Sequence, residues 1–155
     1  MPDLIESYYI GVYWGIREED VRTCAARASA MFHHLAGCDP IFQRWFTLGR
    51  SRKEALKHEV QTDPETLQGL LLKGRNRTDF SHHVIPELGY SLYLWNGRKD
   101  GEDAANINLQ CGAFGSYSVN RCLIRLPQGE ETRSHIMQIS ILTDILLDIV
   151  NIFQP

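Results

Sequence analysis

The sequence predicts one α+β domain built on a mainly antiparallel sheet of about four to five strands. Three observations lead to this fold class. A strand is followed directly by an amphipathic helix near the N-terminus, alternating apolar and polar residues fill the second half, and a long apolar helix ends the chain. Two short helices are expected in the middle. No linker is long enough to divide the 155 residues, so 1–155 are expected to form a single domain.

The first unit is a strand, a tight turn and a helix. Alternation over 8–14 predicts a strand that Gly15 ends. Its core face is expected to carry Tyr8, Ile10, Val12 and Trp14. Apolar residues at three- and four-residue steps predict a helix over 18–36, which Gly37 is placed to end. The helix dipole favours the three acids of its expected first turn, Glu18, Glu19 and Asp20.

Shorter elements are expected between the first helix and the second half of the chain. The apolar run 41–46 predicts a second strand or an extended edge, and 51–60 a short charged helix. Asp63 before Pro64 is an N-cap followed by a first-turn proline, so another helix is expected from there to about Lys73. The polar residues 74–83 are typical of a loop.

Strands dominate the second half. Residues 90–95 and 107–111 predict a hairpin with a long loop, and 118–126 predict a further strand. Ile107, Leu109 and Cys111 face one way, while polar Asn106, Asn108 and Gln110 face the other. One face of the sheet is therefore expected to be solvated.

A terminal helix is expected over 131–153 with an unusually wide apolar arc. Its main stripe is expected to contain Ile139, Leu142, Leu146, Ile149, Val150 and Phe153, opposite Asp144, Asp148 and Asn151. Four further apolar residues lie outside that stripe: Ile141, Ile145, Leu147 and Ile152. Such a helix needs cover on more than one side, so we expect either deep packing or self-association through this helix.

Charge and composition exclude several classes of protein. The formal charge is −3, with 43% hydrophobic and 23% charged residues, so neither disorder nor general nucleic-acid binding is expected. Residues 1–10 contain no basic segment typical of a signal peptide. The apolar stretch 136–153 contains Asp144 and Asp148 at its centre, which argues against a membrane span. We expect a soluble, cytoplasmic protein.

Neither a metal nor a cofactor is expected. The four cysteines, Cys24, Cys38, Cys111 and Cys122, form no CxxC pair and are expected to be free thiols, mostly buried. Neighbouring residues on a helix point about 100° apart, so His33 and His34 do not readily chelate together. His82 and His83 have no carboxylate or cysteine partner at metal-site spacing.

Two groups of residues have a functional alternative to a structural role. The loop 112–118 matches no known motif for a nucleophile or for phosphate binding, and a turn between two strands explains its glycines. The enzyme alternative is a small hydrolase that uses Ser116 or Ser118 with His82, His83 or His135. The second group consists of local clusters of acidic residues. They either stabilise helix N-termini and keep the protein soluble, or form an acidic surface that binds a basic partner. They comprise Glu18, Glu19, Asp20, Glu102, Asp103, Glu130 and Glu131.

Several short motifs resemble immunity protein family fifty-two of bacterial polymorphic-toxin systems. The N-terminal blocks are Tyr9, Tyr13-Trp14-Gly15, Arg17, Asp39-Pro40 and Arg44-Trp45. Later blocks are 88–92, Leu94-Trp95-Asn96-Gly97, Cys111-Gly112, Val119-Asn120 and Leu126-Pro127. The resemblance spans nearly the whole chain in separated blocks, and the family runs well past Pro155, which implies a truncated or short form.

The resemblance implies a non-catalytic antitoxin. It implies a cytoplasmic protein that binds a cognate toxin with a restriction-endonuclease-like nuclease domain, often delivered by contact-dependent secretion. The motif residues are expected to be structural: Tyr13, Trp14, Gly15, Arg17, Trp45, Trp95, Asn96 and Gly97. The rival hypotheses are the small hydrolase and a structural subunit that only self-associates.

Overall fold

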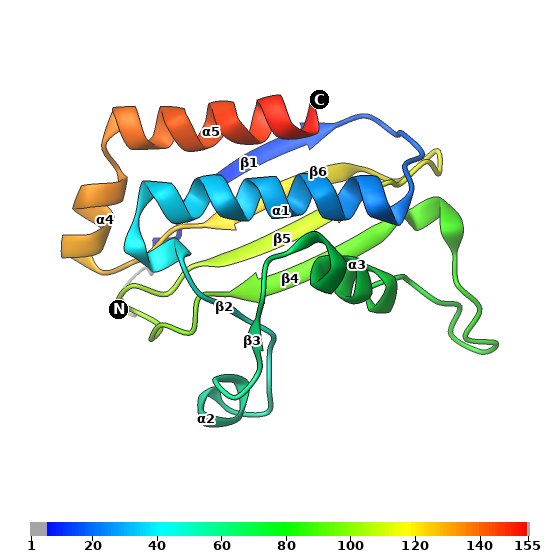
Figure 1. Cartoon of the computed structure of the whole chain (residues 1–155), viewed down its shortest axis with the longest axis horizontal. Helices are drawn as coiled ribbons and strands as arrows, with labels where there is room; N and C mark the ends of the chain where they lie inside the picture. The colour runs from blue at the N-terminus through cyan, green and yellow to red at the C-terminus, as the bar shows by residue number, and fades with distance from the viewer. Residues whose placement is uncertain (1–5, 155) are drawn as a thin grey trace.

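An antiparallel sheet of six strands carries the long helices on one of its faces (Figure 1). The computed structural model describes residues 6–154. The strands lie in the order β1-β6-β5-β4-β2-β3, and every pair is antiparallel. Their bounds are β1 Tyr9–Trp14, β2 Trp45–Phe46, β3 Glu59–Val60, β4 Tyr90–Trp95, β5 Asn106–Cys111 and β6 Asn120–Arg125. The predicted α+β class and antiparallel sheet are confirmed.

The helices form a second layer over this sheet. They are α1 Val21–Cys38, α2 Arg52–Ala55, α3 Pro64–Lys73, α4 Glu130–Ile136 and α5 Ile139–Phe153, with 3₁₀ turns at Pro40–Phe42 and Pro86–Leu88. α1 lies across the middle of the sheet and contacts both α3 and α5, which flank it (Figure 1). α5 also contacts β1, and α3 contacts β4. The core is therefore the space between one sheet face and three helices.

Alternate side chains of the four long strands fill that core. In β1 the burial alternates strictly, with Ile10, Val12 and Trp14 buried and the residues between them exposed. The strand register places the buried residues in rows across the sheet. The first row is Ile10, Ile124, Ile107 and Leu94, and the second is Val12, Cys122, Leu109 and Leu92. The predicted alternation in β1 and β5 is confirmed.

The first helix is shifted from its predicted bounds. It begins at Val21, and Asp20 precedes it as the N-cap, accepting a hydrogen bond from the Thr23 N–H at 2.7 Å. The acids at 18–20 therefore lie before the helix. The helix continues through Gly37, contrary to the prediction, and ends where Pro40 forces Asp39 into an extended conformation.

The segment 41–60 contains less regular structure than its residues predict. The run 41–46 divides into the 3₁₀ turn and the two-residue strand β2. The helix expected over 51–60 is confined to Arg52–Ala55, which is a correction. The reason is sheet pairing, because Glu59 and Val60 pair with β2 and cannot also be helical.

The terminal helix is broken, which corrects the prediction of one helix over 131–153. α4 and α5 meet at an angle of 65°, with Gln138 in an extended conformation between them. Neither proline nor glycine occurs at the break. The change of direction allows Ile136 to be fully buried while α5 lies along α1 and β1. Within residues 6–154 no single helix is long and apolar enough to cross a bilayer. The bent pair α4–α5, taken together, reaches the length and apolar composition of a membrane span, by those two criteria alone.

The buried face of α5 differs from the predicted stripe. Ile145, Ile149 and Phe153 are buried at four-residue steps, whereas Ile139 is 82% exposed and Leu146 is 41% exposed. This is a correction for Ile145, which was expected outside the stripe. The physical reason is that one straight row of side chains enters the groove between α1 and β1. Four half-buried neighbours widen this row: Ile141, Leu142, Val150 and Ile152.

One aromatic pair joins the first strand to the last helix. Trp14 at the end of β1 stacks on Phe153 at the end of α5, with ring centroids 4.8 Å apart and planes 21° apart. Both rings are buried. The pair fixes the last helix over the first strand, so its loss removes both apolar burial and a specific ring contact.

We expect Trp14→Ala to lower the free energy of unfolding by about 3–5 kcal/mol, because a large buried ring leaves a cavity against Phe153. Urea denaturation measures the change. The control is Tyr13→Ala, since Tyr13 is 57% exposed on the other face of the same strand. Equal effects of the two substitutions would contradict the assignment of Trp14 to the core.

Candidate partner-binding surface

A buried asparagine connects the end of β1 to the loop after β5. The Asn120 side chain accepts a hydrogen bond from the Ala113 N–H at 2.9 Å and donates to the carbonyls of Gly15 and Ala113. The Arg17 N–H also donates to the Ala113 carbonyl, at 2.8 Å. The Gly15 and Val119-Asn120 motifs thus meet in space, although they are far apart in the sequence.

Arg17 holds the C-terminus of α5. Its guanidinium donates hydrogen bonds to the carbonyls of Phe153, at 2.7 Å, and Gln154, at 3.1 Å. These are carbonyl groups that the end of a helix leaves without partners, at the negative end of the helix dipole. Behind it, the Glu19 carboxylate pairs with both Arg17 and Arg27, and its side chain is only 7% exposed. Arg17 and Glu19 therefore brace the contact between β1, α1 and α5.

A second buried asparagine shapes the turn after β4. The Asn96 side chain donates to the carbonyls of Ile41 and Asp103 and accepts from the N–H groups of Ala105 and Arg98. Gly97 follows with φ of 73°, and a Cβ there would lie 2.6 Å from the Phe46 ring. The Asn-Gly pair therefore serves a geometry that other residues cannot adopt without strain.

The other two tryptophans are also packed within the chain. Trp45 is buried, donates from Nε1 to the Phe42 carbonyl at 2.9 Å and contacts the Phe32 ring edge-on at 5.2 Å. Trp95 is half-buried beside Phe46, and its Nε1 donates to the Thr47 carbonyl at 3.4 Å. Among the expected motif residues, Tyr13 alone presents a large exposed side chain.

The seven acids proposed as a partner surface lie at opposite ends of the sheet. Glu18, Glu19 and Asp20 follow the end of β1, where Trp14 pairs with Asn120. The other four, Glu102, Asp103, Glu130 and Glu131, lie beyond the far end of β6, where the Gly129 N–H donates to the Glu102 carbonyl. Five residue steps along a strand separate the two groups by about 17 Å or more.

Within this pool the carboxylates differ in availability. Glu19 is enclosed between arginines, and the Thr23 backbone N–H lowers the pKa of Asp20 below its ordinary value. Asp103 pairs with Arg98 at 2.9 Å. Glu18, Glu102, Glu130 and Glu131 are exposed. Glu102 also pairs with Lys99, at 3.7 Å. The larger exposed cluster is the one around Glu102, Glu130 and Glu131, named here the acidic end.

The sheet face turned away from the helices forms a broad open surface. Tyr9, Tyr13 and Tyr93 are exposed on it, and the side chains between them are half-buried. The register places these residues in three rows across β1, β6, β5 and β4. The rows are Tyr9–Arg125–Asn106–Trp95, Gly11–Leu123–Asn108–Tyr93 and Tyr13–Arg121–Gln110–Ser91. We call these twelve residues the open face.

Two arginines are the only charged residues of the open face. Within residues 6–154, neither Arg121 nor Arg125 forms an ion pair, and the Nε of each is shielded from solvent without a hydrogen-bond partner. Burial raises the pKa of Tyr93, and Arg125 partly offsets that rise. Sequence reasoning anticipated a solvated face from β5 but missed this combination, because the rows depend on the register of four strands.

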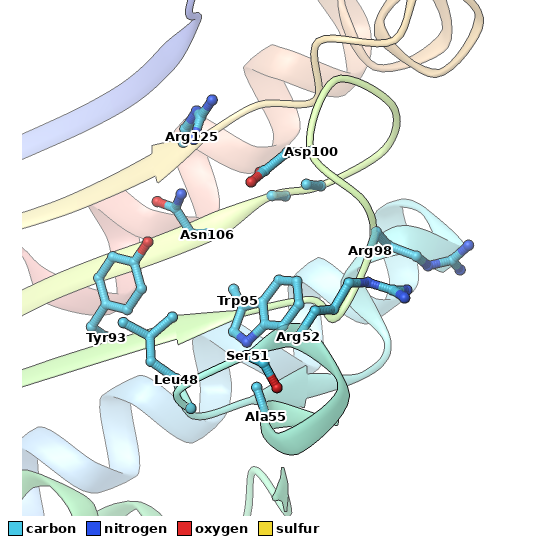
Figure 2. Close-up of a pocket in the computed structure, with 13 residues that line it drawn as sticks. Leu48, Ser51, Arg52, Ala55, Tyr93, Trp95, Arg98, Asp100, Asn106 and Arg125 are labelled. Carbon is cyan, nitrogen blue, oxygen red and sulfur yellow. The ribbon is translucent and has the colours of Figure 1, made fainter. Parts of the chain in front are cut away.

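A pocket of about 300 Å³ opens at one end of the open face (Figure 2). Tyr93, Trp95, Asn106 and Arg125 line its sheet side. The opposite wall comes from the segment around α2, including Leu48, Ser51, Arg52 and Ala55. Arg98 and Asp100, on the loop after β4, complete the rim. Because this loop also contains Glu102 and Asp103, the pocket and the acidic end adjoin each other.

The residues of the hydrolase alternative do not form a catalytic arrangement in the described chain. The Ser118 hydroxyl donates a hydrogen bond to the Gly115 carbonyl at 2.6 Å and lies 3.5 Å from the backbone carbonyl of Glu87. His135 instead pairs with Asp39, at 2.8 Å. His82 and His83 are exposed on the loop after α3. Residues 6–154 bring no three His, Cys, Asp or Glu side chains together at metal-binding distance.

The four thiols are free, and three of them are buried. A hydrogen bond with Cys24, together with burial, raises the pKa of the Cys111 thiol, and burial raises that of Cys122 to about 12. Cys38 is half-buried, and burial with nearby Asp148 raises its pKa as well. These shifts favour the unreactive thiol form over the thiolate.

The fold and its surface define a small α+β protein whose motif residues are engaged within the chain and whose open sheet face is rich in tyrosine, arginine and amide groups. The model of the family Immunity protein 52 matches residues 6–155, and the chain belongs to this family. No curated protein matches the chain. Membership confirms the resemblance drawn from the motifs and supports an antitoxin role.

We expect Glu19→Lys to destabilise the fold by about 3 kcal/mol, since it replaces a buried carboxylate between Arg17 and Arg27 with a third cation. The matched control is Glu18→Lys, because Glu18 is exposed and should change stability by about 0.5 kcal/mol or less. Thermal denaturation of both variants measures the difference. If Glu19→Lys melts with the wild type, the assignment of Glu19 as a brace fails.

Proposed function

We propose that this chain is an immunity protein that binds and neutralises a cognate secreted nuclease toxin in the bacterial cytoplasm. The observation that carries the proposal is the family match over residues 6–155. Most of the family's motif residues in this chain make intrachain contacts, so the toxin would contact mainly other surface residues together with the exposed Tyr9 and Tyr13. Neutralisation is stoichiometric, one chain to one toxin, and involves no catalysis by this chain.

Electrostatics support a nuclease as the partner. A nuclease needs a positive groove to hold a phosphate backbone. The acidic end offers exposed carboxylates at Glu130 and Glu131, and at Glu102, which pairs loosely with Lys99 at 3.7 Å. Asp103 lies beside them and pairs with Arg98. Carboxylates facing such a groove would speed the encounter and compete with the nucleic acid for the same cations.

Co-expression tests this function directly. The protein encoded beside this gene, inactivated by substitution of its catalytic residues, should co-purify with the chain as a one-to-one complex. The variants Ser116→Ala and Ser118→Ala should form the complex as well as the wild type does, because neither hydroxyl takes part in neutralisation. Failure of the wild type to form a complex would contradict the proposal. Serine variants that no longer protect cells from the active toxin would favour the hydrolase instead.

We predict that the triple reversal Glu102→Lys, Glu130→Lys and Glu131→Lys slows toxin association by about tenfold and flattens its salt dependence. Stopped-flow measurements at several ionic strengths test this. Glu18→Lys is the matched control, since Glu18 is equally exposed but lies at the far end of the sheet. An unchanged on-rate and salt slope in the triple variant would show that the acidic end does not steer the toxin.

Self-association through α5 is the second candidate, favoured by its exposed apolar side chains. Ile139, Leu146 and Leu147 are exposed on α5. Leu147 lies opposite the buried row, whereas Leu146 lies beside it, next to Tyr9 and Ile10 of β1. We predict a concentration-dependent dimer in sedimentation velocity that Leu147→Glu abolishes. Gln61→Glu is the control, because Gln61 is an exposed polar residue outside α5. A wild type that remains monomeric at all concentrations would eliminate this candidate.

A further inference from the structure

The open face has the composition of a protein-binding surface. Its three rows contain three tyrosines, one tryptophan and two arginines, but neither lysine nor carboxylate. Tyrosine, tryptophan and arginine dominate the energetic centres of protein interfaces, whereas lysine, aspartate and glutamate are depleted there. This pattern occurs on the one face of the sheet that the long helices leave uncovered (Figure 1).

The charges of the open face determine which partner fits it. Arg121 and Arg125 lie on one strand, four residues apart, which corresponds to a separation of about 13 Å. Neither is ion-paired within residues 6–154. A carboxylate from a partner would form charge-assisted hydrogen bonds with each guanidinium. The complementary surface therefore carries acidic groups.

Two other occupants fit less well. A second copy that packed the same face against this one would bring arginines toward arginines, which is unfavourable. A nucleic acid would find two cations on the open face, but the acidic end adjoins the pocket and the chain has a net charge of −3. A folded protein can present carboxylates to the two arginines alone, whereas a continuous phosphate backbone would also run past the acidic end.

The pocket provides an anchor beside the arginines. Its volume is about 300 Å³. Tyr93 and Trp95 form its apolar side, and Asn106, Arg125 and Asp100 its polar side (Figure 2). Protein interfaces typically place a large side chain of one partner in such a pocket of the other.

We propose that the open face and its pocket are the toxin-docking surface, which receives an acidic patch of the toxin on Arg121 and Arg125 and an apolar side chain in the pocket. The proposal rests on the immunity function above and adds the surface that performs it. The acidic end accelerates the encounter, while the open face holds the toxin once bound. The two surfaces therefore act on different rate constants.

The test measures the affinity of the inactivated toxin for single variants by biolayer interferometry. Arg125→Gln and Tyr93→Ala should each weaken binding by about 30-fold or more, mainly by faster dissociation. Arg22→Gln and Tyr117→Ala are matched controls: Arg22 is exposed on α1, Tyr117 is exposed on the loop after β5, and both should bind normally. Arg121→Gln is a second arginine variant in the central part of the sheet, and thermal melts establish that each variant is folded.

The outcomes separate this proposal from the proposed function. A wild type that does not bind the toxin overturns the immunity function and the docking surface together. A wild type that binds, while all three open-face variants bind equally well, overturns the docking surface alone. Binding of a single-stranded oligonucleotide, or a dimer, that the same variants abolish would assign the open face to another occupant and also overturn the proposal.

Discussion

One constraint organises this molecule: a six-stranded sheet has two faces, and the long helices cover one of them (Figure 1). Because side chains alternate along a strand, each long strand contributes one set of residues to the core and another to the opposite face. Burial of isoleucine, leucine and cysteine against α1, α3 and α5 stabilises the fold. The same alternation presents tyrosine, arginine and amide groups on the open face. If the open face docks the toxin as proposed, stability and binding use different residues of the same strands.

The connections at the sheet ends depend on a few polar groups. Asn120 joins the Gly15 and Ala113 backbones, Arg17 holds the final carbonyls of α5, and Asn96 forms four hydrogen bonds in the turn after β4. Buried polar groups of this kind are costly unless they are fully satisfied, so they specify one arrangement of the chain. They also coincide with the motifs that relate this chain to its family. The motifs therefore contain most of these polar contacts that hold the domain together, while Tyr9, Tyr13 and Trp95 of the same motifs also belong to the open face.

Much of the fold follows from patterns local in the sequence. Alternation identifies β1, β4 and β5, and the Asp63-Pro64 pair marks the start of α3. The errors arise where tertiary contacts decide. The α4–α5 break has no local signal because burial of Ile136 imposes it, and the pairing of Glu59 and Val60 with β2 shortens α2. The candidate site was harder to predict, since the open face depends on a register across four strands. Glu19 resembles its exposed neighbours in sequence, and only the fold places it between Arg17 and Arg27.

We propose that the chain neutralises a nuclease by occupying it. The most direct measurement is a titration of the purified toxin's nuclease activity with increasing amounts of the chain, at toxin concentrations well above the dissociation constant. We expect a linear loss of nuclease activity that reaches zero at one equivalent and that reverses when the complex is dissociated. Unchanged activity at excess chain would contradict neutralisation, and irreversible loss at a small fraction of an equivalent would show catalytic inactivation instead.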